Sequence, residues 1–214
     1  MRTATLPRTR SAVVIGTAAL ESITAAGLLR LAVPEAMGGE GGSLAALASA
    51  ARLLASRDPA AAWIFRAQRL AIELLVHAGN VGLREHLLPQ LLAGERAGTL
   101  PLSPSPRPLL AMEAGNAMRL YGQYPRVPNL QWAGFSVAAP VQIGGTVEWV
   151  MLRGEEDRLR VGIDQGEPCP LGSRSATLIF DGVFFRMDEW LGGPEIDERV
   201  ARVAHVLAEA VPMP

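Results

Sequence analysis

The sequence predicts an α+β protein with an N-terminal helical part, a small β-barrel or β-sandwich domain and one C-terminal helix. Apolar residues recur at helical spacing up to about residue 98, and short alternating runs separated by glycine, proline and acidic turns follow them. An amphipathic stretch then begins after Pro194. We therefore expect three parts, which are a helical domain over 1–98, a β domain over 99–193 and a C-terminal helix over 194–214.

The helical part is divided by start and stop signals. Ser43 is suited to cap one helix, and Asp58 followed by Pro59 is suited to start the next. Pro89 predicts a kink or restart in the last helix, which Gly94 closes. The helices expected from these signals cover residues 18–31, 44–56, 60–79 and 81–92.

The third of these segments is the most apolar, and we expect it to lie at the centre of the helical part. Its large side chains Trp63, Phe65 and Leu70 are then core or subunit contacts and not a ligand site.

A cluster of glycines separates the first two helices. Four glycines fall within the five positions from Gly38 to Gly42, which suits either a phosphate cradle at a helix N-terminus or a tight turn. No strand is predicted before the cluster, so the strand–loop–helix context of a dinucleotide site is missing. We expect a structural turn.

The pattern of apolar and polar residues changes after residue 98. A proline-rich segment without helical period comes first, and turn signals such as Gly144-Gly145 then separate short β-type runs. The candidate strands cover residues 117–121, 133–139, 146–152, 158–163 and 176–185. The final helix carries acidic residues in its first turn, where they interact favourably with the positive end of the helix dipole. It also carries an apolar stripe of Val200, Val203, Ala204 and Leu207.

Composition excludes several classes of function. The chain has 214 residues, a net charge of -1 and a pI near 6.3, which gives no electrostatic reason to expect nucleic acid or an anionic membrane as partner. All basic residues are arginines, so lysine Schiff-base and P-loop chemistry is excluded. A single cysteine, Cys169, cannot form an internal disulfide, and no apolar stretch is long enough to span a membrane, so we expect a cytoplasmic protein.

No catalytic or metal-binding constellation stands out. His77, His86 and His205 lack carboxylate or cysteine neighbours at ligand spacing, and we expect packed or solvated histidines with no metal. Cys169 lies between prolines with no neighbouring base, which disfavours a catalytic thiol. Since no base is placed to activate a serine, a small hydrolase is also disfavoured.

Four phrases resemble the acyl-CoA dehydrogenase family. They are "GLLRLAVPEAMGGEGGSL", "LASRDPAAAW", "REHLLPQLLAGERAG" and "LGSRSATLIFDGVFFRMDEWLGG", and together they run from about residue 20 to residue 193. Each phrase is weak alone, but their order and separation are fairly specific. They are similar to the family's glutamate-glycine turn, a helix start at an aspartate, the lead-in to its β domain, and its last β strands.

The resemblance implies a flavoprotein scaffold in which FAD and an acyl thioester bind between the β domain and a C-terminal helical domain. It also implies that this C-terminal helical domain is absent, so that the chain is truncated after its first helix. The carboxylate that usually abstracts the α-proton comes from that domain and has no position here. We therefore expect no catalytic residue in this chain and a chain that is inactive alone.

The expected flavin-binding residues come from two segments that depart from the family pattern. "LPLSPSPRP" keeps Leu102 and Ser103 but has prolines, which donate no backbone N–H, in place of glycines. "GQYPRVPN" has Arg126, Val127 and Pro128 where the family has tryptophan, isoleucine and threonine. These five residues are the predicted FAD contacts, and they have lost an aromatic face and a hydroxyl donor.

Two functional hypotheses remain open. The chain is either a flavoprotein subunit that oxidises an acyl thioester or related substrate with a partner chain supplying the catalytic domain, or a non-catalytic homologue that stabilises or regulates a full-length acyl-CoA dehydrogenase. Both predict a homo- or hetero-oligomer, because the missing bundle would leave an apolar face bare. The last helix, over 195–210, is the expected part of that interface, with Val200, Val203 and Leu207 docking on the partner.

Overall fold

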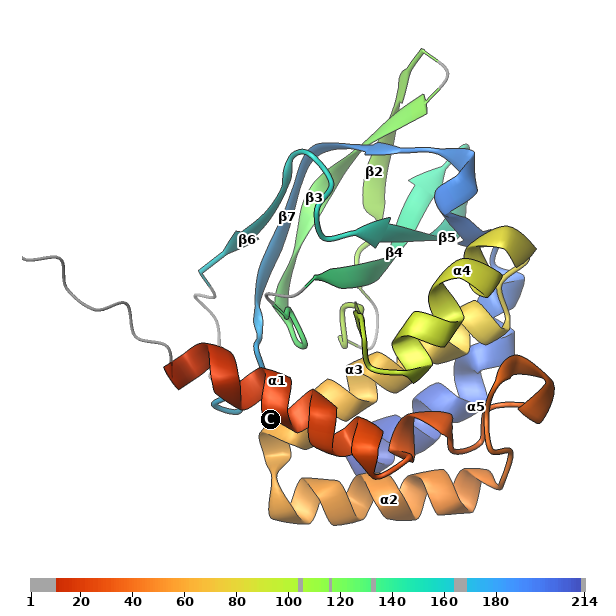
Figure 1. The fold of residues 1–214 in the computed structure, drawn as a ribbon. Helices are drawn as coiled ribbons and strands as arrows, with labels where there is room; N and C mark the ends of the chain where they lie inside the picture. The colour runs from red at the N-terminus through yellow and green to blue at the C-terminus, as the bar shows by residue number, and fades with distance from the viewer. Residues whose placement is uncertain (1–10, 104–105, 116, 132–133, 164–168, 213–214) are drawn as a thin grey trace, which may run out of the picture.

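The computed structural model describes residues 11–103, 106–115, 117–131, 134–163 and 169–212. A layer of helices lies beneath one mixed β-sheet, and the α+β class is confirmed (Figure 1). The helices are α1 (Ser11–Ala25), α2 (Leu44–Arg57), α3 (Pro59–Val76), α4 (Val81–Leu92) and α5 (Glu195–Ala210).

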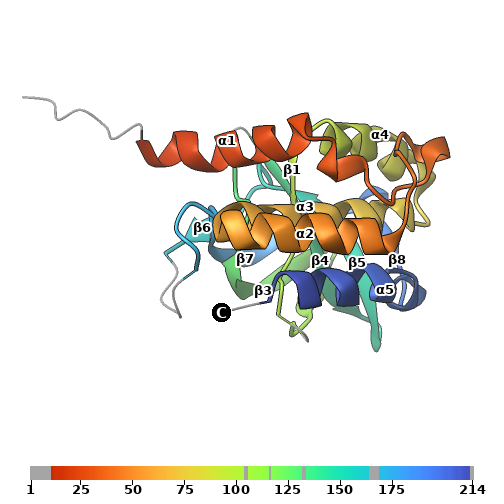
Figure 2. The ribbon, with the colours of Figure 1, turned by 90° about the horizontal axis from the view of Figure 1, so that it is seen from below.

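Helix α3 is the centre of the molecule, as its composition predicts. Every residue from Ala60 to Val76 is buried, including Trp63, Phe65 and Leu70. Figure 2, seen from below, shows α1 and α5 on opposite sides of α3 and α2 in front of it, and the sheet lies on the remaining side (Figure 1). An apolar helix enclosed on all sides needs no solvent-facing stripe, which explains its nearly continuous apolar sequence.

The predicted caps of α2 and α3 are confirmed. Ser43 Oγ accepts the Ala46 N–H at 3.2 Å, and Asp58 Oδ1 accepts the Ala61 N–H at 3.0 Å. Each bond satisfies an N–H that the first helical turn leaves without a partner.

Two expectations about the helices need correction. The first helix was expected over 18–31 but ends at Ala25, because Gly27 adopts a left-handed conformation with φ 71°, and a short 3-10 turn, η1 (Leu28–Arg30), follows. The helix α4 runs through Pro89 without a restart. Pro89 lies in the last turn with its ring exposed, so water can bind the one carbonyl that the proline leaves free.

The sheet is open among the described residues and closes into neither a barrel nor a sandwich. Its strand order is β6-β7-β3-β2-β4-β5-β8, and β1 pairs with β4 in parallel. The strands are β1 (Ala97–Thr99), β2 (Leu109–Ala114), β3 (Ala117–Val127), β4 (Phe135–Ile143), β5 (Thr146–Arg153), β6 (Leu159–Gly162), β7 (Ala176–Phe185) and β8 (Trp190–Gly192). The expected run over 176–185 agrees at both ends with β7, while the start of the run expected over 133–139 falls outside the described residues.

Three strands were not expected. β1 and β8 have three residues each, and β2 lies in the proline-rich segment. β1 pairs in parallel with distant β4, whereas β2 pairs antiparallel with the adjacent β3 over five residue pairs and in parallel with β4 over two. Local alternation of apolar and polar residues carries no signal for the parallel pairings.

The glycine cluster is a structural turn, as expected. Gly38 has φ 82°, and a Cβ on Gly39 would lie 2.1 Å from the Val33 carbonyl oxygen. The loop folds back on the preceding turn, where Gly41 donates its N–H to the Val33 oxygen at 2.8 Å. Glycine is required here because two backbone segments approach each other closely.

The final helix has the predicted bounds but a different partner. Val200, Val203 and Leu207 are buried against α2 and α3 of the same chain. The expectation that these residues dock on another chain is therefore wrong, because α5 completes the chain's own core. One continuous set of buried apolar side chains includes the helices, the sheet and α5. None of the helices in the described ranges is long and apolar enough to cross a bilayer.

Candidate functional site

An apolar cleft of about 490 Å³ lies between α3, α5 and the segment that follows β1. Leu70, Leu74, Leu102, Trp149 and Val200 form much of its wall. Four polar side chains border it, namely Arg66, Ser103, Asp197 and His205. A cavity of this size with a mostly apolar wall and a few polar groups is typical of a small-molecule site.

One hydrogen bond fixes the sheet side of this cleft to α5. Trp149 Nε1, on β5, donates to Asp197 Oδ1 at 2.9 Å. Asp197 lies in the first turn of α5, so its carboxylate also opposes the positive end of the helix dipole. The bond holds the indole as a fixed wall of the cleft.

A buried amide network holds the segment that leads into the cleft. Gln68 Nε2 donates to the Leu91 and Arg96 carbonyl oxygens at 2.8 and 3.1 Å, and Gln68 Oε1 accepts the Gly98 N–H at 2.6 Å. Asn129 Nδ2 donates to Gln68 Oε1 at 2.8 Å and to the Gly98 oxygen at 2.9 Å. The network joins α3, the end of α4, β1 and the chain after β3, so it fixes where residues 100–103 begin.

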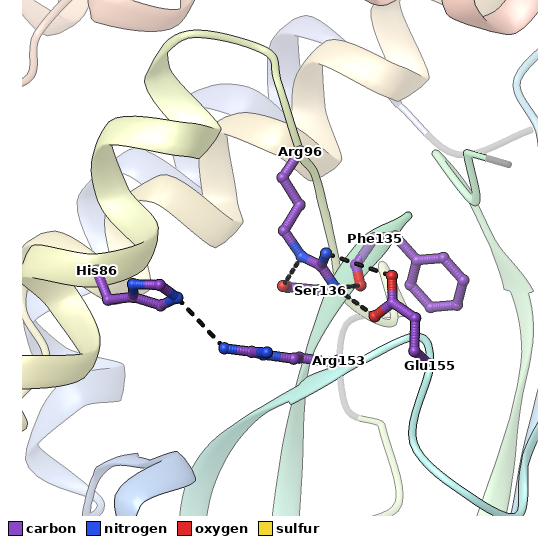
Figure 3. Close-up of polar contacts among 6 residues, drawn as sticks. All are labelled: His86, Arg96, Phe135, Ser136, Arg153 and Glu155. Carbon is purple, nitrogen blue, oxygen red and sulfur yellow. Dashed lines mark hydrogen bonds and ion pairs between the residues drawn. The ribbon is translucent and has the colours of Figure 1, made fainter. Parts of the chain in front are cut away.

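A guanidinium clamp holds the same segment to the sheet (Figure 3). Arg96, just before β1, donates from Nε to Ser136 Oγ at 2.7 Å and from Nη2 to the Phe135 oxygen at 2.5 Å. Its Nη2 also lies 2.6 Å from Glu155 Oε2. The hydrogen bond from Arg96 lowers the pKa of the Glu155 carboxyl.

A second contact lies beside the clamp. The terminal nitrogen Nη2 of Arg153 and Nε2 of His86 are 3.2 Å apart, which joins β5 to α4 (Figure 3). An arginine only donates, so Nε2 of His86 is the acceptor in this contact. The Arg96–Glu155 and Arg153–His86 contacts are both exposed to solvent. They help to position the helices relative to the sheet.

Charged side chains follow one face of α3. Arg66 and Arg69 are 7% and 0% exposed, and Glu73 is 6% exposed. Arg69 Nη2 lies 3.6 Å from Glu73 Oε2, and His77 Nε2 lies 3.2 Å from Glu73 Oε1. Burial lowers the pKa of Arg69 to about 10, and Glu73 opposes that shift.

The five predicted flavin contacts lie in two different settings. Leu102 and Ser103 border the cleft, with Leu102 buried and Ser103 exposed. Arg126 is half-buried with φ 54°, whereas Val127 is fully buried in the core. Pro128 is also buried, and its carbonyl oxygen accepts Thr99 Oγ1 at 2.6 Å. That bond ties the two segments together through β1, but only the first segment reaches the cleft.

These side chains supply part of a flavin site. Ser103 offers an exposed hydroxyl and Arg126 a partly exposed guanidinium, while Val127 and Pro128 lie in the interior of the chain. Prolines at 101, 104 and 106 remove three N–H donors from the first segment. These five positions therefore offer few hydrogen-bond donors to a flavin.

The three histidines are separate, as expected, but the expectation that none has a carboxylate at ligand spacing is wrong for two of them. Glu73 lies four residues before His77, and Glu209 lies four residues after His205. His77 contacts Glu73, His86 contacts Arg153, and His205 Nε2 lies 3.4 Å from Glu209 Oε1 on α5. Across the described ranges, no three His, Cys, Asp or Glu side chains are placed to hold a metal ion.

Sequence reasoning missed the charged residues of α3 and the carboxylate of α5 at the cleft. Arg66, Arg69 and Glu73 interrupt a run that is otherwise apolar and predicted to be enclosed, and that interruption is the signal that could have identified them. Asp197 carries no comparable signal, because acidic residues are ordinary in a first helical turn.

Comparison with known proteins supports the resemblance seen in the sequence. Residues 7–95 match the family described as "Acyl-CoA dehydrogenase, N-terminal domain". No curated protein matches the chain. The resemblance to acyl-CoA dehydrogenases is confirmed for the N-terminal and middle parts of the fold.

Several solved structures share the fold at low sequence identity. Glutaryl-CoA dehydrogenase from Mycobacterium smegmatis aligns over 92% of this chain and 53% of its own, with TM-score 0.79 and 18% identity. An acyl-CoA dehydrogenase complexed with FAD from Bacillus anthracis aligns over 92% of this chain and 36% of its own, with TM-score 0.76 and 20% identity. Butyryl-CoA dehydrogenase from Megasphaera elsdenii aligns over 99% of this chain and 66% of its own, with TM-score 0.74 and 16% identity. The chain thus spans between about one third and two thirds of these relatives.

Proposed function

We propose that this chain is an acyl-CoA dehydrogenase-like flavoprotein subunit that contributes to the oxidation of an acyl thioester or related substrate. In this proposal a partner chain supplies the proton-abstracting carboxylate and further flavin contacts. The cleft between α3 and α5 is the proposed position of the acyl group. The proposal includes the division into 1–98, 99–193 and 194–214, and a cytoplasmic location.

The observation that carries the proposal is the position of Leu102 and Ser103. They border an apolar cleft of about 490 Å³ in a fold shared with an acyl-CoA dehydrogenase that is complexed with FAD. The cleft offers apolar wall for an acyl chain, which gains about 25 cal/mol for each Å² removed from water. The exposed Ser103 hydroxyl at its rim is a donor for a polar group.

Flavin content tests this proposal. The chain is purified alone and after co-expression with a full-length homologue, and visible flavin absorbance and thioester-dependent acceptor reduction are measured. We expect both signals in the complex and neither in the chain alone. Ser103→Ala should weaken flavin retention in the complex, whereas the matched change Ser56→Ala, on the exposed face of α2, should not.

A second candidate is a non-catalytic homologue that occupies a subunit position in a full-length enzyme. The burial of Val127 and Pro128 and the prolines of the first segment favour it, because these positions offer few donors to a cofactor. A stable complex with a full-length homologue that gains neither flavin nor turnover from this chain would support the second candidate and contradict the first.

A further inference from the structure

The charged face of α3 carries more positive than negative charge inside the protein. Arg66 and Arg69 are both at least nine-tenths buried, and Glu73 is the one buried carboxylate beside them. A guanidinium stays protonated in proteins, so it cannot escape the desolvation cost by losing its proton. Burying a charge without a counter-ion is costly, and proteins pair such charges.

Arg69 has its counter-ion, whereas Arg66 has none in the described part of the chain. Arg69 lies 3.6 Å from the Glu73 carboxylate. The Nη1 of Arg66 donates to the Val211 carbonyl oxygen at 2.7 Å, and its Nε has no acceptor. A carbonyl oxygen satisfies one donor but does not neutralise the charge.

Arg66 borders the cleft, and the other polar groups of the cleft do not complete its pairing. Asp197 accepts the Trp149 N–H and forms no ion pair with Arg66. His205 cannot supply a negative charge, and it lies 3.4 Å from Glu209. Ser103 is neutral. The cleft therefore has a buried cation in its wall and otherwise mostly apolar surface.

We propose that the cleft binds an apolar organic molecule that carries a carboxylate, and that Arg66 binds this carboxylate. Leu70, Leu74 and Val200 contact the apolar body of the ligand, and the guanidinium neutralises its charged end. A charge-assisted hydrogen bond in a water-poor site is stronger than a neutral one. This anion also completes the pairing that the described residues leave open on α3.

The inference names the ligand class of the same cleft and therefore deepens the proposed function. It rests on the proposed function in one respect, namely that this cleft is the ligand site. It needs no flavin and no partner chain. Its failure and the failure of the flavin proposal are therefore separate outcomes.

The test measures binding of octanoate, of 1-octanol and of inorganic phosphate to the full chain by calorimetry. Octanoate and octanol share an alkyl chain of equal length, so their difference isolates the carboxylate. We expect octanoate to bind at least about tenfold more tightly than octanol, and phosphate alone not to compete with octanoate. Tight phosphate binding that displaces octanoate would mean a bare anion site and overturn the proposal.

Substitutions then assign the carboxylate to its residue. Arg66→Met should reduce octanoate affinity about tenfold, to the level of octanol, and leave octanol affinity unchanged. Arg66→Lys, which keeps the charge, should restore part of the loss, and Arg52→Met, at an exposed arginine of α2 outside the cleft, should bind like the parent protein. Octanol binding serves as the check that each variant is folded.

One measurement on the parent protein keeps the proposal testable if Arg66→Met does not fold. The ¹³C shift of carboxyl-labelled octanoate is followed against pH, and contact with Arg66 should lower the pKa of the bound carboxyl below that of the free acid. An unchanged pKa, or equal affinity for octanoate and octanol, would overturn the role of Arg66. Binding of neither compound would overturn the cleft itself.

Discussion

Helix α3 carries two buried polar clusters, one on each of two faces, and they differ in how completely they are paired. On the face toward β1, both side-chain groups of Gln68 make hydrogen bonds, and Asn129 is bonded to Gln68 and Gly98. On the face that includes the cleft, nitrogen atoms of Arg66 and Arg69 have no hydrogen-bond acceptor among the described residues.

The completely paired cluster indicates a structural role, whereas the incompletely paired cluster indicates a binding site. A fully paired network fixes the position of backbone segments, and the Gln68 network fixes β1 on α3. An incompletely paired charge costs stability in the isolated chain, and its retention is understandable where a ligand completes it. The following predictions test this comparison, from the largest effect to the smallest.

The largest effect is expected at the paired cluster. Gln68→Leu removes the partners of the Gly98 N–H, the Leu91 oxygen and the Asn129 amide while leaving those groups buried. We expect a loss of about 4 kcal/mol in the free energy of unfolding, measured by urea denaturation. Gln142→Leu, at a side chain with one exposed hydrogen bond, is the matched control and should change little. Equal effects would contradict the role of the network.

The second prediction concerns the ion pair in the incompletely paired cluster. Glu73→Leu leaves Arg69 buried without any counter-ion, and we expect a loss of about 3 kcal/mol in unfolding free energy. Adding Arg69→Met to it should recover most of that loss, because an apolar pair replaces an ion pair. A double-mutant cycle by denaturation measures the recovery. A double variant that is less stable than Glu73→Leu alone would contradict the prediction, because Arg69 would then stabilise the fold without its counter-ion.

The third prediction tests the close approach of β1 to α3. A Cβ at Gly98 would lie 2.7 Å from the Ala71 Cβ and 2.8 Å from Leu91 Cδ2. Gly98→Ala should cost about 2 kcal/mol of stability by thermal unfolding, because β1 must shift. Gly82→Ala, in α4 with no atom nearer than 3.7 Å, should be neutral or stabilising. A neutral Gly98→Ala would mean that β1 moves freely.

The smallest effect concerns pH. Burial raises the pKa of Glu189 to about 7, with Glu156 and Asp188 adding to the shift. The folded protein therefore binds more protons at this group than the unfolded chain between about pH 4.5 and 7. Stability from this group falls as pH rises through that window. Glu189→Gln, which still accepts the Arg186 N–H, should flatten that part of the curve of unfolding free energy against pH; an unchanged curve would contradict the shift.

Much of the fold could be predicted because its signals are local. Asp58 and Pro59 mark the start of α3, the acidic turn after Pro194 marks α5, and the alternation over 176–185 gives β7. The failures are of a different kind. β1 is a strand through parallel pairing with distant β4, which local sequence does not encode. β2 forms a hairpin with the adjacent β3, but its start lies in the proline-rich segment, where no strand was expected.

The site was predicted only in part, because it forms from segments that are distant in sequence. Leu102 and Ser103 do border the cleft, and the flavin role of all five predicted residues stays a prediction. The partner of the α5 stripe was wrong because amphipathicity shows that a face is buried, not what covers it. Arg66 was missed although it interrupts a helix that was expected to be enclosed, and its burial shows that this interruption was the available signal.

The most direct test of the account is the free energy of unfolding of Arg66→Met, without ligand and with saturating octanoate. The account predicts that the ligand-free variant stays within about 1 kcal/mol of the parent protein, because loss of one hydrogen bond to Val211 is offset by removal of an unpaired charge. It also predicts that octanoate stabilises the parent protein and not the variant. A ligand-free loss as large as that of Gln68→Leu, or equal stabilisation of both proteins by octanoate, would contradict it.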